Sequence, residues 1–307
     1  MTNRTAQRKR SQANITAANG HRRGGARGRR SVASRRYPLL AIAGVVVVVL
    51  AMVGLSVVNH AKTPAAPGSS GATKVIAAVT SVPATALDAV GAGTGITPPS
   101  AIAAGAPPVT IDGKPQILYI GAEYCPFCAA ARWPMVIALS RFGTFSGLGL
   151  STSSATDVFP STSTVTFHGS SYASDVIAFD GVETNTNQLA ASGLSYEPLD
   201  TLTAQQQRLM QTFDAPPYTS HAGVIPFSLI GNRYVVIGSS YPPDVLQGKT
   251  WEEIATALSD PSSPIAKQVL AAANVLTAAI CDVTGGQPTN VCTAPGVTSA
   301  VASLPSA

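Results

Sequence analysis

A run of 21 residues without a charge, residues 38–58, constrains this chain most, because it is long enough to cross a membrane. At about 1.5 Å per residue, a helix of this length spans the roughly 30 Å hydrocarbon core of a bilayer. In lipid the backbone must satisfy its own hydrogen bonds, so a single span has to be helical. The run is longer than the apolar segment of a cleaved signal peptide, and Asn59-His60-Ala61 makes a poor cleavage site. We therefore expect an uncleaved signal anchor over residues 37–59.

The charge of the chain is divided between two regions. The first 36 residues hold eleven Lys or Arg and no Asp or Glu, whereas the rest holds nine basic and fifteen acidic residues. A basic flank stays in the cytoplasm, so we expect a single-pass protein of the cell membrane whose carboxyl-terminal part is extracytoplasmic. We interpret residues 1–36 as a disordered tail that sets the topology and is attracted to membrane lipid. Nucleic-acid binding through its Arg and Gly residues is the alternative, and we do not expect it.

Composition separates a linker from a folded region. Residues 60–108 are rich in Ala, Pro, Gly, Ser and Thr, which predicts a flexible linker, with a short helix within residues 75–90. Residues 109–307 are enough for one well-buried domain. Their coarse pattern alternates strands with helices, which predicts an α/β fold.

The predicted elements follow from local signals. Gly231-Asn232 joins two apolar runs into a hairpin, Thr250 and Glu253 fit a capping box, and Asp200 is a plausible helix cap. The last helix begins at Pro264, and its apolar residues recur at spacings of three and four. We expect strands at residues 117–120, 164–167, 175–179, 227–230 and 234–237, and helices at residues 126–142, 202–213, 251–258 and 264–283.

Cys125-Pro126-Phe127-Cys128 carries the chemistry of the chain, because it lies where a predicted strand gives way to a predicted helix. Two residues between the cysteines bring both sulfurs within disulfide range at the first helical turn. The unpaired amides and the positive end of the helix dipole stabilise a thiolate on Cys125, which lowers its pKa. Cys128, one turn inside, is the natural resolving thiol, so exchange would run through a mixed disulfide on Cys125.

Two other interpretations of this motif stay open. Half of a zinc site would need Cys281 and Cys292 as the other half, and their spacing is not that of a zinc knuckle. A structural 125–128 disulfide would close so short a loop that it would contribute little stability. We expect no metal and no cofactor.

Cys281 and Cys292 are expected to form a structural disulfide that fixes the carboxyl-terminal tail. They flank a short loop after the last helix, and an exported domain favours disulfides. A loop of this size contributes roughly 3 kcal/mol in the chain-entropy model. A second, relay-type redox pair is the alternative.

The order of strand, Cys-Pro-Phe-Cys, helix and then Ile225-Pro226-Phe227 before a hairpin resembles the thioredoxin-like superfamily. The resemblance implies a thioredoxin-like fold with a helical insertion at about residues 183–223 and a carboxyl-terminal helical extension. It makes Pro134 a helix-kinking proline and Pro226 a cis-proline beside the reactive sulfurs. More closely, GAEYCPFCAAARWPM, PFSLIGNRY and the paired terminal cysteines resemble an uncharacterised membrane-anchored family, domain of unknown function 929, over about residues 75–295.

Charged side chains near the motif have two interpretations each. Glu123 is either a proton acceptor for Cys128 or a structural or solvent-facing carboxylate. Arg132, one turn beyond Cys128, is either a surface or salt-bridging residue or a partner of the thiolate. We expect neither His168 nor His221 to be a metal ligand or a catalytic base.

These observations predict a membrane-anchored, extracytoplasmic thiol–disulfide oxidoreductase or isomerase. Its catalytic residues would be Cys125, Cys128, Pro226 and Glu123, and its partners would be exported protein thiols or disulfides, with a membrane redox protein as electron partner. The alternative is a non-catalytic envelope protein for binding or assembly, in which both cysteine pairs are structural disulfides.

Overall fold

A mixed sheet of six strands forms the centre of the structure, a computed structural model that describes residues 64–305. The predicted basic tail and membrane anchor therefore lie outside the described residues. Strand β3 (Lys114–Gly121) pairs in parallel with β8 (Ala178–Glu183) and antiparallel with β11 (Phe227–Ile230). The sheet continues from β11 to β12 (Tyr234–Ile237) and β1 (Ser100–Ala101), while β2 (Thr110–Ile111) pairs with the start of β3. The predicted α/β class is confirmed.

The remaining strands form three small two-stranded sheets outside the central one. They are β4 (Thr144–Ser146) with β7 (Ser171–Ala173), β5 (Gly149–Thr152) with β6 (Ser163–Thr166), and β9 (Asn185–Leu189) with β10 (Tyr196–Pro198). The helices are α2 (Ser69–Thr80), α3 (Ala84–Val90), α4 (Pro126–Leu139), α5 (Ala204–Phe213), α6 (Trp251–Ala257), α7 (Pro264–Val283), α8 (Thr289–Cys292) and α9 (Pro295–Val301), with a 3-10 turn, η1 (Pro243–Leu246).

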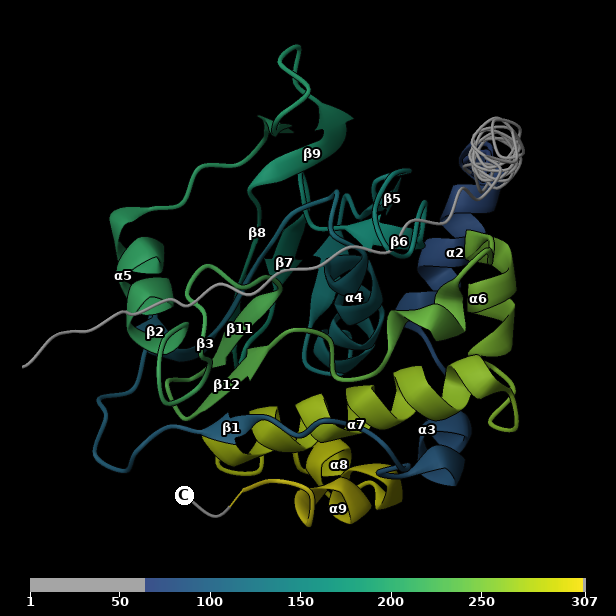
Figure 1. The fold of residues 1–307 in the computed structure, drawn as a ribbon. Helices are drawn as coiled ribbons and strands as arrows, with labels where there is room; N and C mark the ends of the chain where they lie inside the picture. Colours follow the sequence, from purple (N-terminus) through teal and green to yellow (C-terminus); the bar gives the residue numbers. More distant parts are fainter. Residues whose placement is uncertain (1–63, 306–307) are drawn as a thin grey trace, which may run out of the picture. The chain divides into compact units, whose positions relative to one another are not determined.

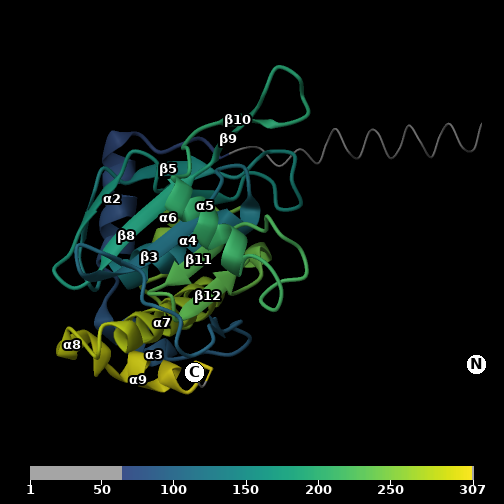
Figure 2. The same ribbon diagram turned by 90° about the vertical axis from the view of Figure 1, so that its left-hand side faces the viewer.

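Helices cover both faces of the sheet (Figures 1 and 2). Successive side chains of a strand point to opposite faces, so β3 sends Ile117 and Tyr119 into one core and Leu118 and Ile120 into the other. The first core is shared with α4 and α7, and the second contains Phe213 of α5. Strand β3 is therefore buried on both faces at residues 117–120, where its sequence is continuously apolar.

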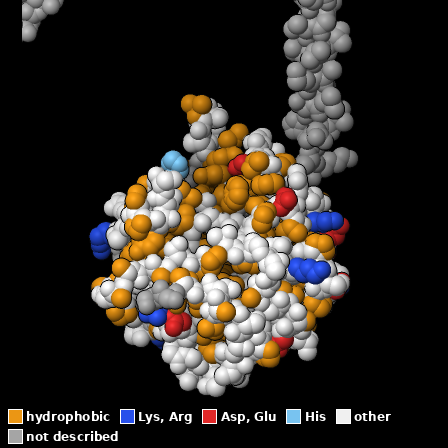
Figure 3. Space-filling view, turned by 60° about the horizontal axis from the view of Figure 1, so that its bottom comes forward, with side chains coloured by type: hydrophobic (Ala, Val, Ile, Leu, Met, Phe, Trp, Pro, Cys, Tyr) orange, Lys and Arg blue, Asp and Glu red, His pale blue; other side chains and the backbone are white. Residues whose placement is uncertain are grey.

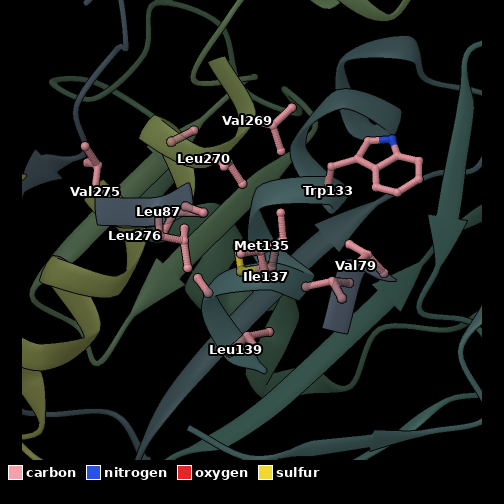
Figure 4. Close-up of a cluster of buried hydrophobic side chains, with 14 of the residues drawn as sticks. Val79, Leu87, Trp133, Met135, Ile137, Leu139, Val269, Leu270, Val275 and Leu276 are labelled. Carbon is pink, nitrogen blue, oxygen red and sulfur yellow. The ribbon is translucent and has the colours of Figure 1, made fainter. Parts of the chain in front are cut away.

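The larger core lies between α4 and α7 (Figure 4). Trp133 and Ile137 of α4 pack in the same cluster as Val269 and Leu276 of α7. The Trp133 ring is fully buried, and its Nε1 donates to the Ser163 carbonyl at 3.1 Å. Helix α4 is thus held from two sides, which fixes the position of its first turn.

Helix α7 is the one helix among residues 64–305 that is long and apolar enough to cross a membrane. In the structure, 83% of its apolar window is buried inside the protein. It is therefore the core helix of this fold, and its composition reflects protein neighbours on most of its surface.

Two helices lie in the range for which the sequence predicted a flexible linker with a short helix. Helices α2 and α3 place Val75, Val79, Ala86 and Leu87 in the larger core, each less than 5% exposed. The Ala, Gly and Ser content predicts a flexible segment, but the apolar residues at three- and four-residue spacing form a face that packs on the core. Such packing supplies most of the stability of a helix in a protein. The folded region therefore begins well before residue 109.

Local signals predicted some boundaries well and others poorly. The Gly231-Asn232 hairpin is confirmed, with φ of 56° and 59° at the two residues, and so is the Thr250 capping box. The strand predicted at residues 175–179 instead spans Ala178–Glu183, because its pairing with β3 sets its limits. The predicted cap Asp200 is wrong: Thr203 caps α5 in a capping box with Gln206.

The carboxyl-terminal segment folds back onto α7. The expected disulfide is present between Cys281 and Cys292, which are 11 residues apart, and it joins the end of α7 to α8. Nearby, Asp282 pairs with Arg233 and accepts a hydrogen bond from the Tyr234 hydroxyl. Figure 3 shows a face on which hydrophobic and neutral polar side chains predominate and charged ones are scattered.

We predict that Val79→Ala lowers the free energy of unfolding by about 2 kcal/mol, from two lost methylene equivalents and the cavity they leave. Lys74→Ala, on the exposed face of the same helix, should change it by less than about 0.5 kcal/mol. Urea titration of the full-length protein in detergent measures both. Equal effects of the two substitutions would show that α2 does not belong to the cooperative fold.

Candidate active site

Cys125 is the residue at which the central strand gives way to α4. Strand β3 ends at Gly121, and Cys125 has an extended conformation with φ −79° and ψ 121°, as the cap of α4. Its Sγ accepts a hydrogen bond from the backbone amide of Cys128 at 3.3 Å. Pro126 occupies the first helical position, where its missing N–H costs nothing. The sulfur thus takes the place of a capping oxygen at a helix start.

The two sulfurs have different environments. Both cysteines are free thiols, but Cys125 keeps 6% of its surface exposed, whereas Cys128 keeps none. The hydrogen bond from the Cys128 side chain, aided by backbone amides and the charge of Arg132, lowers the pKa of the Cys125 thiol although burial opposes this. Burial raises the pKa of the Cys128 thiol well above its usual value. Of the two thiols, Cys125 is therefore the more acidic and the one that keeps some exposed surface.

Pro226 lies beside Cys125, although 101 residues separate them in the sequence. The Ile225–Pro226 peptide bond is cis, and the Ile225 carbonyl oxygen is 3.8 Å from the Cys125 Sγ. Antiparallel pairing explains the approach, because Phe227 of β11 faces Ile120 of β3 and the preceding residues then reach the end of β3. The structure thus brings together Cys125, Cys128 and Pro226.

A buried ion cluster lies behind the motif. Arg132 has no exposed surface, and its guanidinium forms two hydrogen bonds to Glu183, Nε to Oε1 at 2.7 Å and Nη2 to Oε2 at 2.6 Å. Its Nη2 also donates to the Ala122 carbonyl at 2.8 Å, and its Nη1 is 3.7 Å from Oε2 of Glu123. Glu123 Oε1 accepts a hydrogen bond from the Thr166 hydroxyl. Arg132 is therefore a buried salt-bridging residue, and Glu123 is a buried carboxylate and does not face solvent.

The charges of this ion cluster affect the pKa values of its own members and of the two cysteines. Burial raises the pKa of the Glu183 carboxyl to about 7, and the guanidinium of Arg132 limits the rise. Burial would lower the pKa of Arg132, but Glu183 and the other negative groups raise it above its usual value, so Arg132 stays cationic. The Arg132 charge favours the thiolate form of both cysteines.

Glu183 did not emerge from the sequence as a site residue. It ends β8, and its position depends on the parallel pairing of Gly121 with Glu183, which links segments about 60 residues apart. An acidic residue at the end of a short strand of mixed polarity is the only local signal, and it is weak. Exposed strand ends carry such residues as well.

The zinc interpretation loses its ligands in the structure. Cys281 and Cys292 are bonded to each other, and the described part of the chain contains no group of three or more His, Cys, Asp or Glu residues arranged to hold a metal. His168 instead pairs through Nδ1 with Asp200 Oδ1 at 2.7 Å.

Comparison with known proteins identifies a family. A family model described as Domain of unknown function (DUF929) matches residues 103–282, which is more than half of the chain. The matched region includes Cys125, Cys128, Glu183 and Pro226. No curated protein and no solved structure matches the chain significantly.

We predict that alkylation of Cys125 by iodoacetamide has a pH midpoint below about 8.5, the ordinary pKa of a free cysteine. The hydrogen bonds from Cys128 and the charge of Arg132 supply the reason. Peptide mapping by mass spectrometry locates the label. In a Cys125→Ser control, Cys128 should stay unlabelled while the protein is folded, and a midpoint at or above 8.5 in the unmutated protein would contradict the assignment.

We predict that Arg132→Met lowers the free energy of unfolding by about 3–5 kcal/mol at pH 8, because two buried carboxylates lose their cation. The folded-state pKa of Glu183, about 7, lies above its ordinary 4.5, so its protonation stabilises the fold fully below pH 4.5, and this stabilisation is lost as pH rises from there through 7. At pH 5 the Glu183 carboxyl is mostly protonated and needs no cation. The destabilisation caused by Arg132→Met should therefore be smaller at pH 5 than at pH 8. Arg208→Met, on the exposed face of α5, is the matched control, and a loss equal to that of the control would contradict the prediction.

Proposed function

Because this chain belongs to the family described as Domain of unknown function (DUF929), a description that names no reaction, we propose its function from the site itself. The site is a thiol–disulfide exchange centre in which Cys125 attacks and Cys128 resolves. The unequal environments of the two sulfurs carry this proposal. Cys125 has a lowered pKa and keeps 6% of its surface exposed, whereas Cys128 has a raised pKa and no exposed surface.

The reaction follows from this difference. The Cys125 thiolate attacks one sulfur of a substrate disulfide, forms a mixed disulfide, and releases the other substrate sulfur as a thiolate, which takes up a proton. Cys128 then loses its proton and attacks the Cys125 sulfur. This step closes the 125–128 disulfide and releases the second substrate thiol. Two electrons pass from the dithiol to the substrate, and the reverse sequence introduces a disulfide into a substrate dithiol.

The buried carboxylates provide a proton acceptor for Cys128 in this proposal. The Cys128 thiol is far from water, so its proton needs an internal base. Glu123 Oε2 is buried and has no hydrogen-bond partner in the described part of the chain, which leaves its lone pairs available. Glu183 has a pKa of about 7 through burial and shares Arg132 with Glu123. A proton that reaches Glu123 can therefore be balanced by the charge of this cluster.

The wider proposal concerns scaffold and location. The parallel pair β3–β8, the antiparallel strands β11 and β12, the cysteines at the start of α4 and the cis-proline before β11 support a thioredoxin-like fold. The uncharged run at residues 38–58 and the basic tail support a single-pass anchor in the cell membrane with the site outside the cytoplasm. Exported proteins would be the substrates, and a membrane redox protein would be the electron partner.

We predict that a full-length Cys128→Ser variant accumulates mixed disulfides with cell-envelope proteins, because Cys125 can attack but nothing resolves the product. Non-reducing gels and mass spectrometry of a membrane fraction detect them. The double variant Cys125→Ser, Cys128→Ser is the control and should trap none.

The redox potential of the Cys125–Cys128 couple in the unmutated protein completes this test. A catalytic couple should lie above about −300 mV, whereas structural disulfides typically lie below that value. Absence of trapped partners together with a pair that resists dithiothreitol would favour the non-catalytic alternative, in which the scaffold serves binding or assembly.

A further inference from the structure

Exposed hydrophobic side chains are concentrated on the segments around Cys125. Within residues 64–305, five large hydrophobic side chains are exposed: Phe127 40%, Val158 62%, Leu189 51%, Leu194 93% and Val301 53%. Phe127 is part of the Cys-Pro-Phe-Cys motif itself. The segments that carry Val158, Leu189 and Leu194 contact the motif through aromatic side chains, whereas Val301 belongs to the carboxyl-terminal helix α9.

Aromatic contacts fix two of these segments to the motif. The Phe127 ring meets the Phe159 ring edge to face, with centroids 5.9 Å apart, so the loop that carries Val158 lies against the start of α4. The Tyr196 ring of β10 stacks on the Tyr124 ring at 4.1 Å and 6°. Tyr124 directly precedes Cys125. The β9–β10 hairpin, with Leu189 and Leu194, is therefore held beside the reactive sulfur.

A cleft runs between these two segments. Its volume is about 440 Å³, and residues 152–156 and 187–189 line it. The Ser154 amide donates to the Tyr124 carbonyl at 2.8 Å, and the Tyr196 hydroxyl donates to Ser154 Oγ at 2.8 Å. The cleft wall is thus joined directly to the residue before Cys125. Hydroxyl, amide and backbone groups line it without a charged side chain, which suits the backbone of an extended peptide.

The charge of this region selects against anions. Asp157 and Glu197 are the charged residues of the two segments 153–162 and 185–198, and neither segment contains Lys or Arg. A small anionic thiol finds no cation there and meets two carboxylates. A neutral or basic peptide segment meets no repulsion and can bury its side chains on Phe127, Val158 and Leu189.

We infer that this surface docks an extended polypeptide segment that carries apolar side chains beside its cysteine, in preference to a small anionic thiol compound. The inference rests on the proposed exchange reaction and names its substrate class. The cleft between residues 152–156 and 187–189 receives the peptide backbone, and the exposed hydrophobic residues receive its side chains.

The test compares disulfide probes after correction for their intrinsic reactivity. Full-length reduced protein in detergent is mixed with a disulfide-linked peptide whose cysteine is flanked by Leu and Phe, with the same peptide carrying Glu at those positions, or with glutathione disulfide. Quenched samples analysed by mass spectrometry give the rate constant of the protein with each disulfide, and each is divided by the rate constant of the same disulfide with dithiothreitol. We expect the apolar peptide to react at least about tenfold faster than either other probe. A tenfold ratio corresponds to the free energy gained when one or two apolar side chains are partly buried on the surface.

Variants separate this surface from the exchange chemistry. The double variant Leu189→Ser, Leu194→Ser should slow the apolar peptide by about five- to tenfold and leave glutathione disulfide unchanged, because only apolar contacts are lost. Val301→Ser removes an exposed hydrophobic residue on helix α9, away from the hairpin, and should change neither rate. Equal rates for all probes, or a double variant equal to the unmutated protein, would overturn the inference and leave the exchange reaction standing. Absence of reaction with every probe would overturn both.

Discussion

A buried cation between two carboxylates holds the site together. Burying Arg132 and Glu183 is costly unless their charges are matched, and the two hydrogen bonds between them meet this condition. The same guanidinium binds the Ala122 carbonyl in the turn before Cys125 and lies near Glu123. One side chain therefore links helix α4, the end of β8 and the turn that carries the reactive sulfur. The geometry of the motif and the acidity of its thiols depend on the same contact.

The central sheet brings Glu183 and Pro226 close to the reactive cysteines. Strand β3 is buried on both faces and has a parallel neighbour on one side and an antiparallel neighbour on the other. Its end therefore meets the end of β8, with Glu183, and the start of β11, with Pro226. Helix α4, whose first turn holds Cys128, packs against α7 on one side and against β6 on another. Packing far from the sulfurs thus contributes to their position.

The sequence predicted features with local causes and missed those that depend on distant pairing. Pro126 and the cysteine spacing predict the start of α4, the Gly231-Asn232 pair predicts the hairpin, and Thr250 with Glu253 predicts a cap. Glu183 was missed because the limits of β8 depend on β3, some 60 residues away. Asp200 was chosen as a cap because its residue type fits, whereas the nearer Thr203 caps α5 and Asp200 accepts a hydrogen bond from the Glu183 amide.

The burial of α7 has a consequence for biosynthesis. This helix is long and apolar enough to cross a membrane, and in the finished fold its neighbours bury 83% of its apolar window. Several of those neighbours, such as α3 and α4, are made earlier, whereas α9 follows it in the chain. Until α9 has been synthesised, a newly made chain therefore leaves part of the apolar surface of α7 uncovered. During that interval, partitioning into a bilayer or association with a second chain competes with folding.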